Sequence, residues 1–510
     1  GVVVVSETIS VTQGTSLEIA GATPGATADG SHTTNIFAVD GGSTLHLADM
    51  LVENGQAFAG GAVSATQHSK VTLSGYMTLA ANTASLGGAI YADSSAVVIY
   101  GEDTVFRSNH ASDSGGAIMT EGSSTLSWDG VTTFANNSAN HWGGSVHMRD
   151  SSNMYWSGTT TFQDNAASDG GAVYADSSTV TWTGDDTTFR DNHATSHGGA
   201  IFAESSTVSW GGEDTVFHEN NASFDGGAIL ASDSSAIAWD GVTVFAENSA
   251  NDEGGAVFLN RHSSVSWRGD TTFTSNTAHR GGGIYSNSST VSWVGQDTTF
   301  RGNYVSENGG AILACNSTAV SWEGETSFVN NIAGKWGGGM YVLDYSNVSW
   351  TGSTEFLNNT ATDGSGLFMR GHCIGNWSGA TSFTSNRADG TGGGLNVHTS
   401  SEAYWTGVTT FTGNTGNRAG AIGGGIFSAA NPHGQYFEGV EFRSNLARVG
   451  GAVATFGTGN DDECTPFPTI FLRCRFFGNR ATETGGAVET AFGQEKFISS
   501  YFESNSAGVI

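Results

Sequence analysis

The chain has 510 residues, of which 74 are glycine and 4 are proline, and only 13% of its residues are charged. Lysine and arginine number 18 against 48 aspartate and glutamate residues, a formal net charge of −30 at pH 7, which makes nucleic acids and anionic membrane surfaces poor partners. No uninterrupted apolar segment approaches the ~20 residues that cross a bilayer, so we expect no membrane span.

Residues 1–50 carry short apolar stretches that predict strands, but they lack the motif that recurs later. The stretches are Val2–Val5, Leu17–Ile19, Asn35–Val39 and Leu45–Leu47. We expect irregular starting coils here, which cover the N-terminal edge of a repeat array.

From residue 51 to residue 510 one pattern returns about every 28 residues: Gly-Gly-Ala-Ile, then Ser-Ser-x-Val-Ser-Trp-x-Gly, then Thr-Thr-Phe-x-x-Asn-x-Ala. Spacing this regular predicts stacked, equivalent units. The phenylalanines that mark it lie 27 or 28 residues apart: Phe106, Phe134, Phe162, Phe189, Phe217, Phe245, Phe273, Phe300, Phe328, Phe356, Phe383 and Phe411.

Each unit contains three segments that alternate apolar and polar residues and end in turn residues. In residues 170–192, Val180 and Trp182 share one face of a strand, and Thr187 and Phe189 share one face of the next. A unit this small cannot bury its apolar face alone, so each strand should pair in parallel with the same strand of the next unit. The sequence therefore predicts an all-β, right-handed, single-stranded parallel β-helix, a solenoid with about 28 residues and three strands per coil.

The repeat resembles that of the chlamydial polymorphic outer membrane proteins, which is also found in secreted proteins of algae and protists. The paired signals are Gly-Gly-Ala followed by Ile, Leu or Val, and Phe-x-x-Asn. Clear copies are Gly115–Ile118 with Phe106–Asn109, and Gly485–Val488 with Phe476–Asn479. The resemblance implies display at the cell surface or adhesion, with little chemistry.

Eleven of the thirteen tryptophans occupy the same Trp-x-Gly position and should form a column. The column is either an exposed aromatic stripe that binds sugars or a neighbouring molecule, or an internal ladder. We favour the ladder, because each tryptophan shares a face with the valine two positions earlier. A column of threonines beside the phenylalanines fits ordinary strand residues better than an ice-binding face.

Seven Asn-x-Ser/Thr sequons are candidate glycosylation sites of a secreted protein, and all should point outward. By contrast, none of the fifteen motif asparagines from Asn109 to Asn505 is a sequon, which fits an asparagine ladder packed inside the turn. The seven are Asn136, Asn221, Asn287, Asn316, Asn347, Asn358 and Asn376.

Insertions near residues 417–435 and 457–468 interrupt the repeat. The second holds Cys464, ten residues before Cys474, and a disulfide between these two would close the loop in an oxidising compartment. Cys315 and Cys373 lie two coils apart, too far for an unstrained bridge, so we expect them to be buried small residues.

No cluster of carboxylates with a catalytic base is evident, and no catalytic residue, cofactor or metal is predicted. His193 and His197 could share a side of the coil, but they lack further ligands at a fixed spacing.

We therefore predict a non-enzymatic extracellular protein at the cell surface, a structural subunit of a fibre, sheath or appendage. Self-association into filaments would join Val2, Val3, Val4 and Val5 to the apolar end at Val509 and Ile510. The alternative is a cell-surface adhesin that binds glycans or partner surfaces. A polysaccharide-acting β-helix enzyme is the least favoured possibility.

Overall fold

The computed structural model describes the chain except residues 23–24, 185, 296, 417–419, 430–434, 458–468, 492–494 and 509–510. No helix in the described ranges is long and apolar enough to cross a membrane. The chain divides into two compact units. Unit 1 comprises residues 1–251, 256–258 and 263–265, and unit 2 comprises residues 252–255, 259–262 and 266–510.

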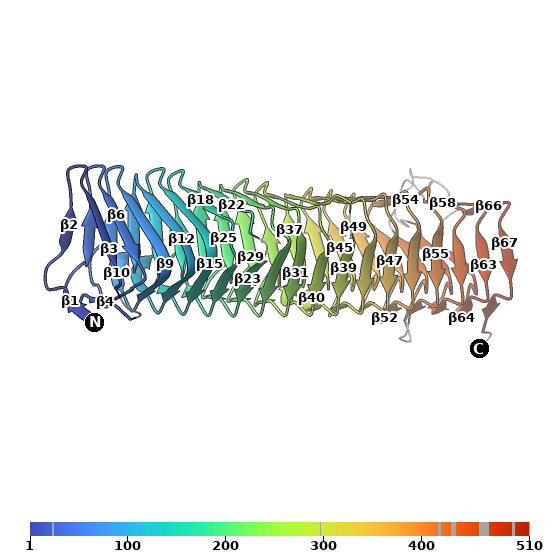
Figure 1. Cartoon of the computed structure of the whole chain (residues 1–510). Coiled ribbons are helices and arrows are strands. Elements are labelled where there is room, and N and C mark those ends of the chain that lie inside the picture. Colours follow the sequence, from blue (N-terminus) through green and yellow to red (C-terminus); the bar gives the residue numbers. More distant parts are fainter. Residues whose placement is uncertain are drawn as a thin grey trace. The chain divides into compact units, whose positions relative to one another are not determined.

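A typical coil of unit 1 contains the three predicted strands and a short fourth one. These are β21 (Val173–Asp176), β22 (Thr179–Trp182), β23 (Asp186–Arg190) and the two-residue β24 (His193–Ala194). Each pairs in parallel with its equivalent in the next coil: β25 (Ile201–Glu204), β26 (Thr207–Trp210), β27 (Asp214–His218) and β28 (Asn221–Ala222). Identical motif positions therefore lie side by side (Figure 1).

Coils of unit 2 have the same construction. Strands β41 (Ile312–Cys315), β42 (Ala319–Trp322), β43 (Thr326–Val329) and β44 (Ile332–Ala333) pair in parallel with β45 (Met340–Leu343), β46 (Asn347–Trp350), β47 (Thr354–Leu357) and β48 (Thr360–Ala361). The predicted parallel β-solenoid with about 28 residues per coil is confirmed in both units.

Residues 1–50 are built in the same way, although they lack the motif. Strands β1 (Val2–Val4), β2 (Ile9–Val11) and β3 (Ser16–Ala20) pair in parallel with β4 (Thr27–Asp29), β5 (Phe37–Val39) and β6 (Thr44–Ala48). These residues continue the parallel stacking, and Val2, Val3 and Val4 are 64%, 64% and 61% exposed.

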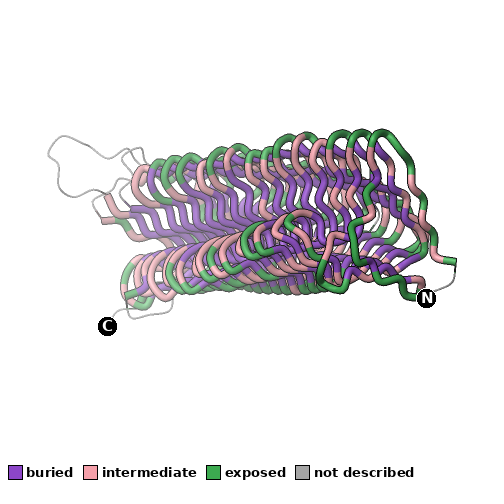
Figure 2. Tube along the Cα trace, turned by 90° about the vertical axis from the view of Figure 1, so that its left-hand side faces the viewer, coloured by how far each residue is buried: buried purple, intermediate pink, exposed green. Residues whose placement is uncertain are grey.

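The core of each unit consists of aromatic ladders inside the coils, where buried residues gather (Figure 2). In unit 1, Phe189 stacks on Phe162 and on Phe217 with ring centroids 4.8 Å apart. The tryptophans of the repeat are internal too, since Trp182 is 1% exposed and stacks on Trp210 at 4.0 Å. In unit 2, Trp322 stacks on Trp350 at 4.6 Å. The internal interpretation of the tryptophan column is therefore confirmed.

The motif asparagines form a second ladder, which uses the full hydrogen-bonding capacity of the amide. Asn192 Nδ2 donates to Asn220 Oδ1 at 2.9 Å and to the Phe162 carbonyl at 3.0 Å. Its Oδ1 accepts from the backbone N and from Nδ2 of Asn165, at 3.2 and 3.0 Å. Unit 2 repeats these bonds, for example between Asn331 and Asn359. A glycan on such a buried side chain would break the ladder.

The glycine pair of the motif is required by the backbone. Gly170 has φ +63°, a left-handed conformation that disfavours residues with a Cβ. A Cβ on Gly171 would lie 2.1 Å from the Gly199 carbonyl oxygen of the next coil. The second glycine therefore lets successive coils approach.

We expect Phe189→Ala to destabilise the protein by about 3 to 5 kcal/mol, because it leaves a cavity between two stacked rings. The control is Thr188→Ala on the outer face of the same strand, which should cost less than about 1 kcal/mol. Denaturant unfolding measures both, and equal losses would contradict the ladder.

Asn192→Asp should destabilise by about 3 to 5 kcal/mol, because it removes two donors and buries a charge without a partner. Asn136→Asp is the matched control, since Asn136 is exposed and has φ 55° in a turn where Asp164 and Asp191 occupy equivalent positions. Thermal unfolding of the two variants should therefore differ strongly. Similar melting temperatures would show that the ladder bonds contribute little.

Candidate functional site

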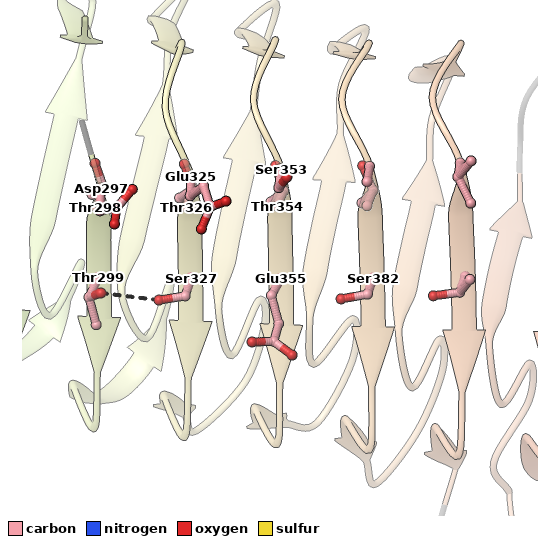
Figure 3. Close-up of a pocket in the computed structure, with 14 residues that line it drawn as sticks. Asp297, Thr298, Thr299, Glu325, Thr326, Ser327, Ser353, Thr354, Glu355 and Ser382 are labelled. Atoms are coloured by element: carbon pink, nitrogen blue, oxygen red, sulfur yellow. Dashed lines mark hydrogen bonds between the residues drawn. The ribbon is translucent and has the colours of Figure 1, made fainter. Parts of the chain in front are cut away.

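A shallow groove of about 350 Å³ lies on the outer face of the phenylalanine strands of unit 2 (Figure 3). It crosses β39 (Thr298–Arg301), β43, β47, β51 (Thr381–Thr384) and β55 (Thr409–Thr412). Its fourteen lining residues are Asp297, Thr298, Thr299, Glu325, Thr326, Ser327, Ser353, Thr354, Glu355, Ala380, Thr381, Ser382, Val408 and Thr410.

Strand alternation gives the groove a row of hydroxyl groups. Thr298, Thr326 and Thr354 point inward and are buried, so Thr299, Ser327 and Glu355 occupy the outer positions. Thr299 and Ser327 are joined by a hydrogen bond of 3.2 Å (Figure 3). The predicted threonine column thus lines the groove with hydroxyl groups, and Glu355 interrupts the column.

The groove has carboxylates but no basic side chain. Asp297, Glu325 and Glu355 line it, and none of its lining residues is His, Lys or Arg. The arrangement can offer hydrogen bonds to a polar chain, whereas a lyase would need a base such as Lys or Arg at the same place.

Outside the groove, one group of side chains could hold a metal ion. Among the described residues, the ligand atoms of His218, Glu219 and Glu247 in unit 1 all lie within 4.8 Å of one another. His193 and His197 do not join this group. His193 Nδ1 lies 3.0 Å from Asn221 Oδ1, and His197 contacts Asp169.

A second aromatic row lies outside the coils and was not predicted. Tyr174 points outward from β21, yet it is 6% exposed and its ring lies 6.1 Å from Trp142. Unit 2 has the corresponding pair Tyr341 and Trp336, with ring centroids 5.7 Å apart. The signal was present in the sequence, because Trp142 and Trp336 are the two tryptophans outside the Trp-x-Gly position and each directly precedes a glycine pair.

Two histidines of unit 1 belong to this outer row, and their pKa values are shifted in opposite directions. His147 in β17 (Val146–Met148) is 2% exposed, and burial, helped by the charge of Arg149, lowers its pKa to about 3. His197 Nδ1 lies 3.0 Å from Asp169 Oδ1, and this hydrogen bond raises the pKa of His197. His147 is therefore a buried neutral group, while His197 is held by carboxylates.

The seven predicted glycosylation sites lie at or near the surface. Five of the sequon asparagines are exposed and Asn221 and Asn287 are half-buried, so their glycosylation stays a prediction.

Cys474 is a buried free thiol, and burial raises the pKa of this thiol to about 11. Its predicted partner Cys464 lies outside the described residues, as do residues 417–419 and 430–434 of the first insertion and residues 458–468 of the second. Cys315 and Cys373 are buried, as expected.

The model of the Chlamydia polymorphic membrane protein repeat matches five segments, residues 103–121, 159–176, 186–204, 270–287 and 297–315. The resemblance seen in the sequence is therefore confirmed. No curated protein and no solved structure matches the chain significantly. The repeats and the β-solenoid together indicate a surface or outer-membrane protein and favour a non-enzymatic role.

His147 should make the protein sensitive to acid. Below about pH 6.5 His147 binds a proton in the unfolded chain, whereas in the native state it binds one only near pH 3. The free energy of unfolding therefore decreases as the pH falls from about 6.5 to about 3. His147→Phe, which places the residue found at Phe202 in the same row, should reduce the drop in melting temperature between pH 7 and pH 4.5. Exposed His193→Phe is the control and should leave the drop unchanged. Equal drops in all three proteins would contradict the assignment.

Proposed function

We propose that the chain is a non-enzymatic structural protein of the cell surface. The observation that carries the proposal is that the repeated side chains inside the coils bind their own equivalents, as the Asn192–Asn220 and Phe189–Phe217 contacts illustrate. The interior thus serves stacking alone. Such a solenoid grows by adding coils and provides extension and rigidity rather than a reaction centre.

The groove supports this choice over an enzyme. Glycoside hydrolysis requires two carboxyl groups that flank one bond, one of them with a raised pKa. The carboxylates of Asp297, Glu325 and Glu355 come from three successive coils of a hydroxyl-lined surface without a cation. This surface suits contact with a neutral polar polymer better than catalysis.

Association of molecules end to end is the finer form of the proposal. Strand β1 exposes three valines, and β66 (Glu495–Ile498) and β67 (Tyr501–Glu503) expose Phe497, Ile498 and Phe502 at 43%, 47% and 44%. Addition of strands between such edges would bury these side chains and pair their backbone groups. A head-to-tail contact of this kind propagates into filaments. The predicted contacts of Val509 and Ile510 lie outside the described residues.

Electron microscopy and sedimentation of the native protein test the association. Val3→Glu should abolish filaments, because it places a charge on the edge strand. Val131→Glu is the matched control, since Val131 is 44% exposed on a lateral face, and it should leave filaments intact. Native protein that stays monomeric at high concentration, or filaments that survive Val3→Glu unchanged, would contradict end-to-end association.

A second candidate function is adhesion, which the hydroxyl row of the groove favours. Ser and Thr hydroxyls donate and accept hydrogen bonds, as the hydroxyls of a neutral polysaccharide do. Binding of such a polysaccharide that Ser327→Val and Ser382→Val weaken together would support adhesion at this groove.

A further inference from the structure

A cationic and aromatic patch lies on the outer face of unit 2, away from the residues that line the groove. It consists of Trp336, Tyr341, Phe368, Arg370 and Asn396, and we call it the Trp336 patch. Strand register aligns it, because Tyr341, Phe368 and Asn396 occupy the same position on β45, β49 (Leu367–Arg370) and β53 (Leu395–His398). Three successive coils thus contribute to one surface.

Arg370 is a cation without a carboxylate partner. Its guanidinium carbon lies 5.7 Å from the centroid of the Trp336 ring, and the side chain is exposed. Among the described residues no ion pair of Arg370 forms, although acidic residues outnumber basic ones 48 to 18 in the chain. Arg149, at the same motif position in unit 1, pairs with Glu121. Arg370 is therefore available to an external anion.

The Trp336 ring is held rigidly by its neighbours. It meets Tyr341 edge-on at 5.7 Å and Phe368 edge-on at 5.9 Å, and both neighbours are at most 5% exposed. Trp336 itself is half-exposed. A fixed aromatic face of this kind packs against a flat apolar surface, such as the C–H face of a sugar ring, at little entropic cost.

Asn396 is a buried member of the patch and is tied to its polar neighbours. Its Nδ2 donates to Thr391 Oγ1 at 2.7 Å, and Thr391 Oγ1 donates to Asp363 Oδ1 at 2.8 Å. This chain of bonds uses the amide nitrogen, while Asn396 Oδ1 has no partner among the described residues and the side chain is 1% exposed. The buried amide therefore supports the patch from within and is not itself a contact for a ligand.

We infer that the Trp336 patch binds a pyranose sugar that carries a carboxylate, a unit of an acidic glycan. In the complex the Arg370 guanidinium turns from the ring to the carboxylate, and the sugar ring packs on Trp336. The net charge of −30 does not prevent this, because charges beyond about 8 Å are largely screened at physiological ionic strength. The inference goes beyond the structural role and does not depend on filament formation.

Isothermal titration calorimetry of the whole chain tests the inference with four probes. Methyl glucuronide and the methyl glycoside of N-acetylneuraminic acid are the two carboxylated sugars and distinguish the two sources of the acid. Methyl glucoside lacks the carboxylate, and acetate lacks the sugar. At least one acidic sugar should bind about tenfold or more tightly than methyl glucoside and than acetate, as a charge-assisted bond predicts.

Arg370→Gln should abolish this preference for the acidic sugar, and Arg149→Gln, the matched control, should retain it. Trp336→Leu should weaken the binding of both acidic sugars, and near-UV circular dichroism should show that the variant keeps its fold. If Trp336→Leu does not fold, the exposed Arg370→Gln variant still decides. Equal binding of methyl glucoside or acetate, no binding of either acidic sugar at ~10 mM, or equal losses in Arg370→Gln and Arg149→Gln would overturn the inference.

Discussion

The asparagine ladder is the interaction on which the rest of the structure depends. One amide per coil donates twice and accepts twice, so it is saturated only when the next coil presents an equivalent amide at the same height, as Asn165, Asn192 and Asn220 do. A coil that is longer or shorter between its asparagines must bulge elsewhere. This requirement fits the spacing of 27 or 28 residues from Phe106 to Phe411, and the glycine pair that brings successive backbones together.

Because the side chains inside the coils stack on their equivalents in the next coil, differences between coils appear at outward-facing positions. The outer positions of the phenylalanine strands in unit 2 vary among Thr299, Ser327 and Glu355 without disturbing the inward Thr298, Thr326 and Thr354. The outer row of the Gly-Gly-Ala strands varies more, from Tyr174 in unit 1 to Asn396 in unit 2. A surface protein of this construction can change its partners by substitution at outer positions while its fold is retained.

Period-two alternation and the fixed spacing were sufficient to predict the three longer strands of each coil, their register and the internal tryptophans, since Val180 and Trp182 must share a face. The same rule failed at Tyr174 and Tyr341, which point outward but are buried because Trp142 and Trp336, at the turns before the glycine pairs, lie against them. Sequence spacing cannot reveal which turn lies over which strand. The Trp336 patch depends on that placement and on the missing carboxylate beside Arg370, and neither is visible in one repeat.

Hydrogen exchange of backbone amides tests the asparagine ladder most directly. The amide N–H of each motif asparagine lies in a turn, where exchange is normally fast, yet it donates to the side chain of the next coil, as Asn192 does to Asn220 Oδ1 at 3.2 Å. Protection of these turn amides equal to that of the adjacent phenylalanine strands is the predicted result. Fast exchange at the motif asparagines in an otherwise protected protein would contradict the ladder.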